Sequence, residues 1–184
     1  MEKGTVPFSI TIFHQSWKRE PSHFPLDYLF NPKYNSIVKT KSKGKRIMKK
    51  YIHRVKYYET DKMGITHHSN YIRWMEEARI DYLDQIGLGY KKMEDDGIIS
   101  PVIGVECDYK VSTTFDDNIE IEVKVEEFKG VKLIIKYVMT NIDTKDIVLV
   151  GKTKHCFLDK DNKPIILKKS FPEIDKKLRE LALK

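Results

Sequence analysis

One long helical pattern in a chain otherwise dominated by strand patterns most limits how this sequence can fold. Between Asn70 and Ile86, apolar residues recur at spacings of three and four, which predicts one amphipathic helix with a single buried stripe. Ser69 or Asn70 is a suitable cap for its start, and Gly87 suits its end. At about 1.5 Å per residue, this helix is roughly 25 Å long. The strands must therefore pack against one main helix.

The strand patterns lie on both sides of this helix in the sequence. Strict alternation of apolar and polar residues over 119–125 is the clearest of them. The other strands are predicted over residues 51–58, 103–110, 131–142 and 147–158, with a tight turn at Lys129 and Gly130. We expect a short helical or loop piece at 90–95, and a short amphipathic helix or frayed tail at 173–183.

These elements predict an α+β domain in which a curved antiparallel sheet wraps around one long helix. Each predicted strand has one apolar face, and a single helix must cover most of that apolar surface. A sheet that curls around the helix is the economical solution. Such a sheet still has long edge strands, which usually need a partner chain or charged protection. We therefore expect a homo-oligomer.

The basic charge of the chain belongs to its first 47 residues. The formal net charge of all 184 residues is +7, and residues 1–47 carry nine basic against three acidic side chains, a net charge of +6. The predicted domain, residues 48–184, is therefore almost neutral. Residues 1–47 have several interpretations: a disordered leader, translation from a start upstream of a true beginning at Met48, a targeting segment, or a basic arm that binds polyanions such as nucleic acid.

Length and composition exclude several classes of protein. A chain of 184 residues with 40% hydrophobic and 33% charged residues forms one ordinary domain and is not disordered as a whole. No apolar run reaches the roughly 18 to 20 residues that a membrane-spanning helix needs. Cys107 and Cys156 are too few for a disulfide framework, so we expect a reducing, cytoplasmic setting and two inert thiols.

The loop between the first predicted strand and the helix is the best candidate for chemistry. Asp61 offers a carboxylate there, and Gly64 allows the backbone to approach a ligand closely. The chain then enters a helix N-terminus, whose free N–H groups and positive dipole end favour developing negative charge. A base and an oxyanion site are the two parts that acyl transfer needs. On residue types alone, however, an aspartate before a glycine more often forms an ordinary turn.

A resemblance to a known family strengthens the catalytic interpretation. The matching residues are Arg54-Val55-Lys56-Tyr57-Tyr58-Glu59-Thr60-Asp61, Gly64, His68, Asn70-Tyr71 and Glu76-Glu77-Ala78-Arg79. Together they closely resemble the opening of the 4-hydroxybenzoyl-CoA thioesterase family, and in particular its YbgC-like acyl-CoA thioester hydrolases. The resemblance extends over roughly 48–158 and has no counterpart in residues 1–47. It implies the hot-dog fold, an antiparallel sheet curled around one long helix and dimerised edge to edge, often as tetramers.

The resemblance also implies roles for individual residues. Asp61 matches the catalytic aspartate, which would act as general base on water or attack the thioester carbonyl to give an acyl-enzyme anhydride. The backbone N–H of His68 matches the donor that polarises this carbonyl, and Gly64 matches the glycine that keeps the loop close to the substrate. We interpret Asn70 as tying the loop or contacting substrate, and Tyr71 as core or acyl-pocket lining.

Neighbouring residues have more than one interpretation. Glu77 is the minor alternative base, because another branch of hot-dog thioesterases uses a helix glutamate and lacks the loop aspartate. Glu76 and Arg79 stand three residues apart on the helix, which favours a surface or interface ion pair. The imidazole of His68 either touches the substrate or makes a structural hydrogen bond, and His67 is expected to face solvent.

The predicted function is hydrolysis of an acyl-CoA thioester to a free acid and CoA by a homodimer or homotetramer, with no metal or redox cofactor. A thioester of acyl carrier protein is the close alternative, because its pantetheine arm is the same. Two alternatives belong to other classes: a non-catalytic hot-dog module that binds acyl-CoA, and, more weakly, a nucleic-acid tether through the basic arm. The main prediction involves neither nucleic acid nor a membrane span.

Overall fold

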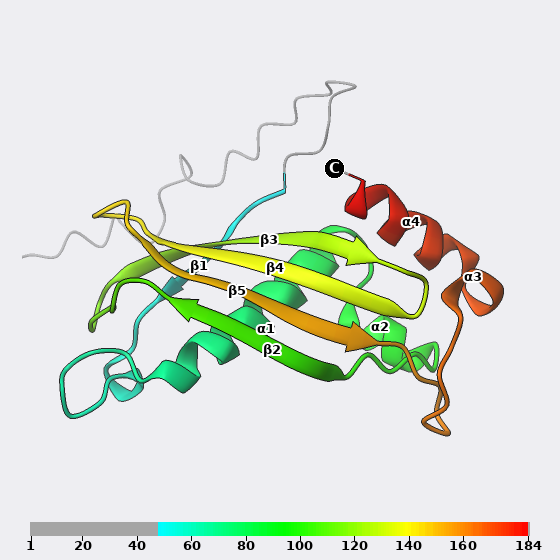
Figure 1. Cartoon of the computed structure of the whole chain (residues 1–184), viewed down its shortest axis with the longest axis horizontal. Helices are drawn as coiled ribbons and strands as arrows, with labels where there is room; N and C mark the ends of the chain where they lie inside the picture. The colour runs from blue at the N-terminus through cyan, green and yellow to red at the C-terminus, as the bar shows by residue number, and fades with distance from the viewer. Residues whose placement is uncertain (1–47, 184) are drawn as a thin grey trace, which may run out of the picture. The chain divides into compact units, whose positions relative to one another are not determined.

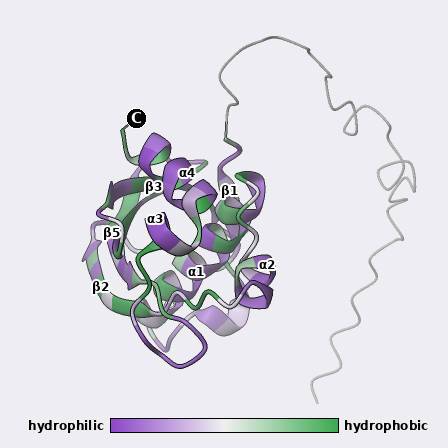
Figure 2. Ribbon diagram, turned by 90° about the vertical axis from the view of Figure 1, so that its right-hand side faces the viewer, coloured by the Kyte–Doolittle hydropathy of each residue, from purple (hydrophilic) through white to green (hydrophobic). Residues whose placement is uncertain are grey.

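The computed structural model describes residues 48–183, so the predictions made for residues 1–47 lie outside the described residues. An antiparallel sheet with the strand order β1-β3-β4-β5-β2 forms the body of the domain (Figure 1). Its strands are β1 (Tyr51–Arg54), β2 (Val102–Tyr109), β3 (Asn118–Phe128), β4 (Lys132–Asn141) and β5 (Ile147–Cys156). The long helix α1 (His68–Gln85) lies against the sheet, which curves around it (Figure 2). The predicted α+β class is confirmed.

Helix α1 buries the predicted stripe, but it begins earlier than predicted. The buried apolar residues include Tyr71, Trp74, Met75, Ala78 and Tyr82, as the spacing indicated, and Leu83 is buried as well. The helix starts at His68, and its cap is His67, whose Nδ1 accepts the N–H of Ser69 at 3.4 Å. The prediction of Ser69 or Asn70 as the cap is therefore wrong, because the ring nitrogen of His67 takes the role of the usual side-chain oxygen. Gly87, with φ of +72°, follows the helix as predicted.

Strands β3 and β4 supply the largest share of the sheet's buried face. Their inward residues alternate as the sequence predicts, and they are Ile119, Ile121, Val123 and Val125 on β3 and Leu133, Ile135, Tyr137 and Met139 on β4. The turn between the two strands lies at Lys129 and Gly130, where Gly130 has φ of +77°. Period-2 alternation therefore predicted these two strands, and the Lys129-Gly130 pair predicted the turn between them.

The first strand is shorter than its sequence suggests. β1 ends at Arg54, and a 3-10 turn, η3 (Tyr57–Glu59), replaces the second half of the predicted strand 51–58. Local hydrogen bonds explain the difference, since the Glu59 side chain accepts the N–H of Lys56 at 2.6 Å and the Glu59 N–H donates to the Lys56 carbonyl at 3.0 Å. Tyr57 and Tyr58 have high β-propensity, but in the structure both are exposed and neither belongs to a strand.

Strand β2 forms one edge of the sheet, and its apolar residues are not covered. The register places Val105 opposite Thr153 and Tyr109 opposite Leu149, which are buried residues of β5 on the side of the sheet that faces α1. Val105 and Tyr109 are nevertheless 39% and 45% exposed. Helix α1 therefore covers less of the apolar surface than the sequence led us to expect, and the uncovered part is concentrated at this edge.

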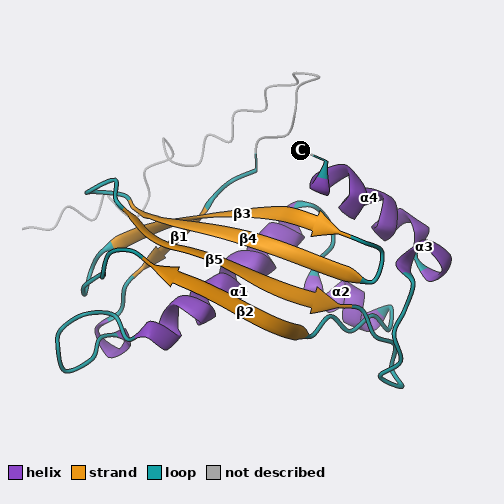
Figure 3. Cartoon of the chain, in the orientation of Figure 1, coloured by secondary structure: helices purple, strands orange, loops and turns teal. Residues whose placement is uncertain are grey.

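The remaining helices lie at the end of the molecule opposite the loop that precedes α1 (Figure 3). They are α2 (Tyr90–Asp95), α3 (Leu167–Ser170) and α4 (Pro172–Ala182), of which α2 and α4 match predicted segments and α3 was not predicted. Leu178 of α4 is fully buried and closes this end of the core. Within residues 48–183, none of the helices has the length and apolar character needed to span a membrane.

Candidate active site

The loop that joins η3 to α1 is a narrow turn held by its own backbone. The N–H of Asp61 donates to the Ile65 carbonyl at 2.8 Å, and the N–H of Gly64 donates to the Asp61 carbonyl at 2.9 Å. Gly64 has φ of +76°, yet a Cβ at this position would meet no atom within 4 Å. The backbone conformation, rather than a lack of space, therefore explains the glycine in the protomer.

The carboxylate of Asp61 is half-buried at the base of this turn. Its Oδ1 accepts the N–H of Met63 at 2.8 Å, which is the turn contact expected of an aspartate at this position. Among residues 48–183, no hydrogen-bond partner is recorded for the second oxygen. The turn role and the catalytic role are therefore compatible, because one oxygen fixes the side chain while the other can take up a proton or attack.

The start of α1 presents backbone donors beside this turn. His68 is the first residue of the helix, so its N–H has no acceptor within the helix, and none is recorded for it among the described residues. The His67 N–H, one residue earlier, donates to the Glu59 carbonyl at 2.8 Å and so ties the helix start to the root of the Asp61 turn. The side chains of His67 and His68 are both exposed. The site thus combines a carboxylate with an unpaired amide donor.

Asn70 and Tyr71 support the loop from the first turn of α1. Asn70 is buried, and its Nδ2 donates to the Glu59 carbonyl at 2.7 Å, which agrees with the loop-tying interpretation. The hydroxyl of Tyr71 lies 2.9 Å from Thr113 Oγ1, which in turn lies 2.7 Å from Thr66 Oγ1. Both side chains are engaged with protein groups in the protomer, and their contact with substrate stays a prediction.

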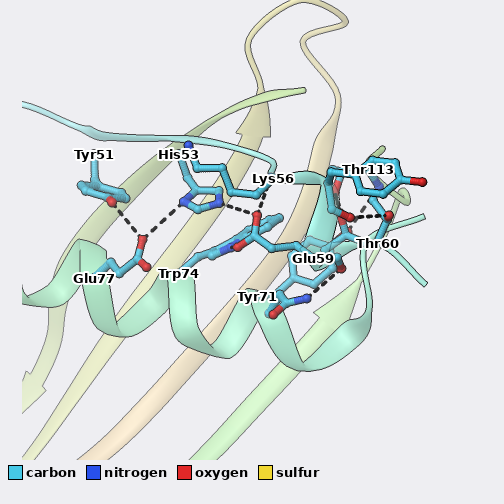
Figure 4. A network of polar contacts seen from close by, with 12 residues as sticks. Tyr51, His53, Lys56, Glu59, Thr60, Tyr71, Trp74, Glu77 and Thr113 are labelled. Carbon is cyan, nitrogen blue, oxygen red and sulfur yellow. Dashed lines mark hydrogen bonds and ion pairs between the residues drawn. The ribbon is translucent and has the colours of Figure 1, made fainter. Parts of the chain in front are cut away.

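Glu59 is a buried carboxylate beside the site for which the sequence predicted no separate role. Its carboxylate is buried and lies 2.9 Å from His53 Nε2, while its other oxygen accepts the Trp74 Nε1–H at 2.8 Å (Figure 4). Burial alone would raise the pKa of Glu59, but hydrogen bonds from the Lys56 N–H, His53 and Trp74 outweigh burial and lower it. Glu59 is part of the run that carries the resemblance, but neither its spacing nor its type indicated this role.

Glu77, the alternative base, lies at the other end of the same network. Its carboxylate accepts the Tyr51 hydroxyl at 2.9 Å and lies 3.3 Å from His53 Nδ1. Figure 4 shows Glu77 directed toward β1, with Thr60 and Thr113 at the opposite side of the view. This arrangement gives Glu77 a place in the network between α1 and β1, and its role as the alternative base stays a prediction.

Arg79 forms a second buried polar cluster instead of the predicted ion pair. Arg79 is buried while Glu76 is exposed, and no ion pair between them is present among the described residues. Arg79 Nη1 lies 3.4 Å from Nε2 of His155, which is also buried. The surface-pair prediction is therefore wrong, because Arg79 lies in the buried stripe of α1 and Glu76 does not.

Neither cysteine lies in an activating environment. Cys107 and Cys156 are both free and half-buried, and burial raises the pKa of the Cys107 thiol. No group of three or more His, Cys, Asp or Glu side chains within residues 48–183 is arranged to hold a metal ion. Asp61 and the backbone N–H of His68 are the predicted catalytic groups that lie at the start of α1.

Comparison with known proteins places these features in context. A family model described as the thioesterase-like superfamily matches residues 55–180. A Bacillus subtilis protein provisionally named acyl-CoA thioesterase YneP is 33% identical over 120 residues, which cover 65% of this chain and 86% of that protein. The acyl-CoA thioesterase YbgC of Haemophilus influenzae is 30% identical over 84 residues, covering 45% of this chain and 62% of that protein.

A solved structure agrees with these sequence matches. The DHNA-CoA thioesterase from Staphylococcus aureus superposes with a TM-score of 0.70 at 32% identity, covering 73% of this chain and 91% of that chain. This match confirms the hot-dog fold that the resemblance implied.

Proposed function

Because the chain belongs to the thioesterase-like superfamily and is a thioester hydrolase, we propose that it cleaves acyl-CoA thioesters to a free carboxylic acid and CoA. Coenzyme A thioesters are the substrates named for the relatives described above. One observation of the site carries the proposal: half-buried Asp61 has one carboxylate oxygen held by the Met63 N–H, in the turn that leads to α1, and the N–H of His68 at the start of α1 has no acceptor among the described residues.

In the proposed reaction, the thioester carbonyl lies between these two groups. The His68 N–H donates to the carbonyl oxygen as negative charge develops on it, and such a donor typically contributes about 2.7 to 4 kcal/mol to lowering the barrier. Asp61 takes the proton of an attacking water, or it attacks the carbonyl carbon itself and water then hydrolyses the anhydride. In both routes the C–S bond breaks, and the thiolate leaves and is protonated to CoA.

We propose that two copies join through β2 and complete the site. β2 is an edge strand of the described sheet, and its exposed apolar residues suit antiparallel pairing with the same strand of a second copy. The Tyr109 hydroxyl donates to the His68 carbonyl at 3.1 Å, so this interface would border the start of α1. A homodimer is the smallest assembly that covers β2, and a homotetramer would need a second interface.

We also propose a reducing, cytoplasmic setting for the enzyme. Both thiols are unpaired in the fold, and neither is needed for the proposed reaction.

The test is release of free thiol from aliphatic and aromatic acyl-CoA substrates and from an acyl-carrier-protein thioester. Asp61→Asn should lower kcat/KM by about 10²- to 10⁴-fold, because the amide can neither accept the proton nor attack. Asp161→Asn is the matched control, since Asp161 is an exposed turn aspartate after β5, and it should retain wild-type activity. Circular dichroism and gel filtration establish that both variants fold and assemble as the wild type does.

Three outcomes would contradict parts of this proposal. Tight binding of acyl-CoA without thiol release would identify a non-catalytic binding module. Release from the carrier-protein thioester alone would replace the substrate class. Full activity of Asp61→Asn together with an inactive Glu77→Gln variant would transfer the role of base to the helix.

A further inference from the structure

We infer that Glu59 is the positioning residue of the proposed active site, because it fixes the Asp61 turn relative to the first N–H groups of α1. The inference rests on the proposed function, since it concerns the same reaction. Glu59 precedes Asp61 by two residues and is only 5% exposed. It lies at the point where β1, the turn and the helix meet (Figure 4).

The carboxylate of Glu59 is held by three separate parts of the chain. One oxygen, Oε2, accepts the Lys56 N–H at 2.6 Å and lies 2.9 Å from His53 Nε2. The other oxygen accepts the Trp74 Nε1–H at 2.8 Å. Trp74 has no exposed surface, and the His53 ring stacks on it with centroids 4.4 Å apart. Because both oxygens are fixed by rigid groups, Glu59 cannot rotate without breaking contacts to β1 and α1.

The backbone carbonyl of Glu59 holds the start of the helix. It accepts the His67 N–H at 2.8 Å and the Asn70 Nδ2–H at 2.7 Å. His67 is the cap of α1, and Asn70 lies in its first turn. Glu59 therefore anchors both parts of the proposed site. It holds the Asp61 turn because it is two residues away in the chain, and it holds the N–H groups at the start of α1 through its backbone carbonyl. A misplacement of about 1 Å between such groups can cost about 10²-fold in rate.

Glu59 acts through other groups and not on the substrate. The described contacts engage both of its oxygens, so neither is free to accept a proton from water. The surroundings of Glu59 also favour a carboxylate over the amide of a glutamine, because hydrogen-bond donors face both side-chain oxygens. In Glu59→Gln, the new NH₂ group must point at another donor, either the Trp74 Nε1–H or the Lys56 N–H. The glutamine variant therefore keeps the volume of the side chain but disturbs its anchoring.

The test is steady-state hydrolysis by the full-length Glu59→Gln variant, with the acyl-CoA on which the wild type is most active. We expect kcat to fall about 10- to 100-fold, with KM within about twofold of the wild type, since the anchor sets geometry and not binding. Glu59→Asp keeps the charge and should recover part of kcat. Thr153→Val is the matched control, because it removes a buried hydroxyl from the Tyr137 and His155 contacts and leaves the Asp61 loop untouched.

A double variant separates positioning from general loss of stability. If Glu59 acts through Asp61, then adding Glu59→Gln to Asp61→Asn should reduce the residual kcat by less than about threefold. A multiplicative loss in the double variant, or wild-type kcat in Glu59→Gln, would overturn the inference. If Glu59→Gln does not fold, Trp74→Phe provides the second test, since it removes the donor to Oε1 while keeping an aromatic ring in the core, and it should lower kcat several-fold.

The two proposals fail in different ways. A wild-type protein that releases no thiol from any substrate refutes the proposed function itself. A wild-type enzyme that needs Asp61 but is indifferent to Glu59→Gln refutes only the positioning role. Loss of kcat in Thr153→Val equal to that in Glu59→Gln would likewise refute it, because any destabilised core would then have the same effect.

Discussion

Two carboxylates, two residues apart, have opposite environments in this fold. Glu59 is buried with both oxygens engaged, whereas Asp61 is half-buried with one oxygen engaged by the Met63 N–H. Environment, rather than residue type, separates a structural anion from a reactive one. This contrast is the basis on which we propose an anchoring role for Glu59 and a chemical role for Asp61.

His155 provides a prediction about stability at the residue scale. Burial, followed by the nearby charge of Arg79, lowers the pKa of His155 from 6.5 to about 4. Between pH 6.5 and 4, His155 therefore binds a proton in the unfolded chain but not in the folded chain. The contribution of neutral His155 to the free energy of unfolding is complete above pH 6.5, and it is lost as the pH falls toward 4.

We expect His155→Gln to remove this part of the pH dependence. In urea titrations between pH 4 and 6.5, the free energy of unfolding of the wild type should fall with decreasing pH, with a contribution from His155 of at most about 1.4 kcal/mol per pH unit. The variant should be less stable at pH 7 and should have a shallower slope. Identical slopes for the two proteins would show that His155 is not excluded from protonation in the folded state.

At the scale of elements, the turn before α1 depends on one backbone conformation. Gly64 has φ of +76°, where alanine is disfavoured by roughly 1 to 2 kcal/mol and asparagine less so. Because a Cβ would meet no atom within 4 Å, the cost should come from the backbone alone. Gly64→Ala should therefore lower the free energy of unfolding by about 1 kcal/mol, and Gly64→Asn by less. Equal losses measured in urea would mean that the side chain meets something, such as a second copy.

The accuracy of sequence-based prediction differs between elements for a physical reason. Helix α1 and strands β3 and β4 were predictable because burial repeats along a regular element, and the period is visible locally. The structure of residues 55–59 was not predictable from the sequence. There the Glu59 side chain replaces the hydrogen bonds of a strand ladder, and its partner Trp74 is fifteen residues away. The pairing of Thr66 with Thr113 depends in the same way on residues far apart in sequence. Polar networks of this kind carry no periodic signal.

At the scale of the whole molecule, the edge strand β2 exposes apolar residues that no other part of the described domain covers. The sheet curls around α1, but the helix side of β2 and the aromatic residues around the Asp61 turn stay exposed, among them Tyr57 and Phe115, whose rings meet edge to face. Exposed apolar residues that cluster on a surface often mark interaction sites. Its position beside the start of α1 is the reason why we propose that the assembly of two copies completes the site.

This link gives a prediction that couples oligomeric state to activity. Val105→Lys places a charge on the helix side of the edge strand, where desolvating it between two copies is unfavourable. We expect sedimentation at micromolar concentration to show a dimer for the wild type and a shift toward monomer for the variant, with kcat/KM reduced in parallel at least about tenfold. Ile166→Lys is the matched control, since Ile166 is also exposed but lies before α3, and it should stay dimeric and active. A fully active monomer would show that one protomer contains the whole site. It would contradict the proposal that pairing through β2 completes the site.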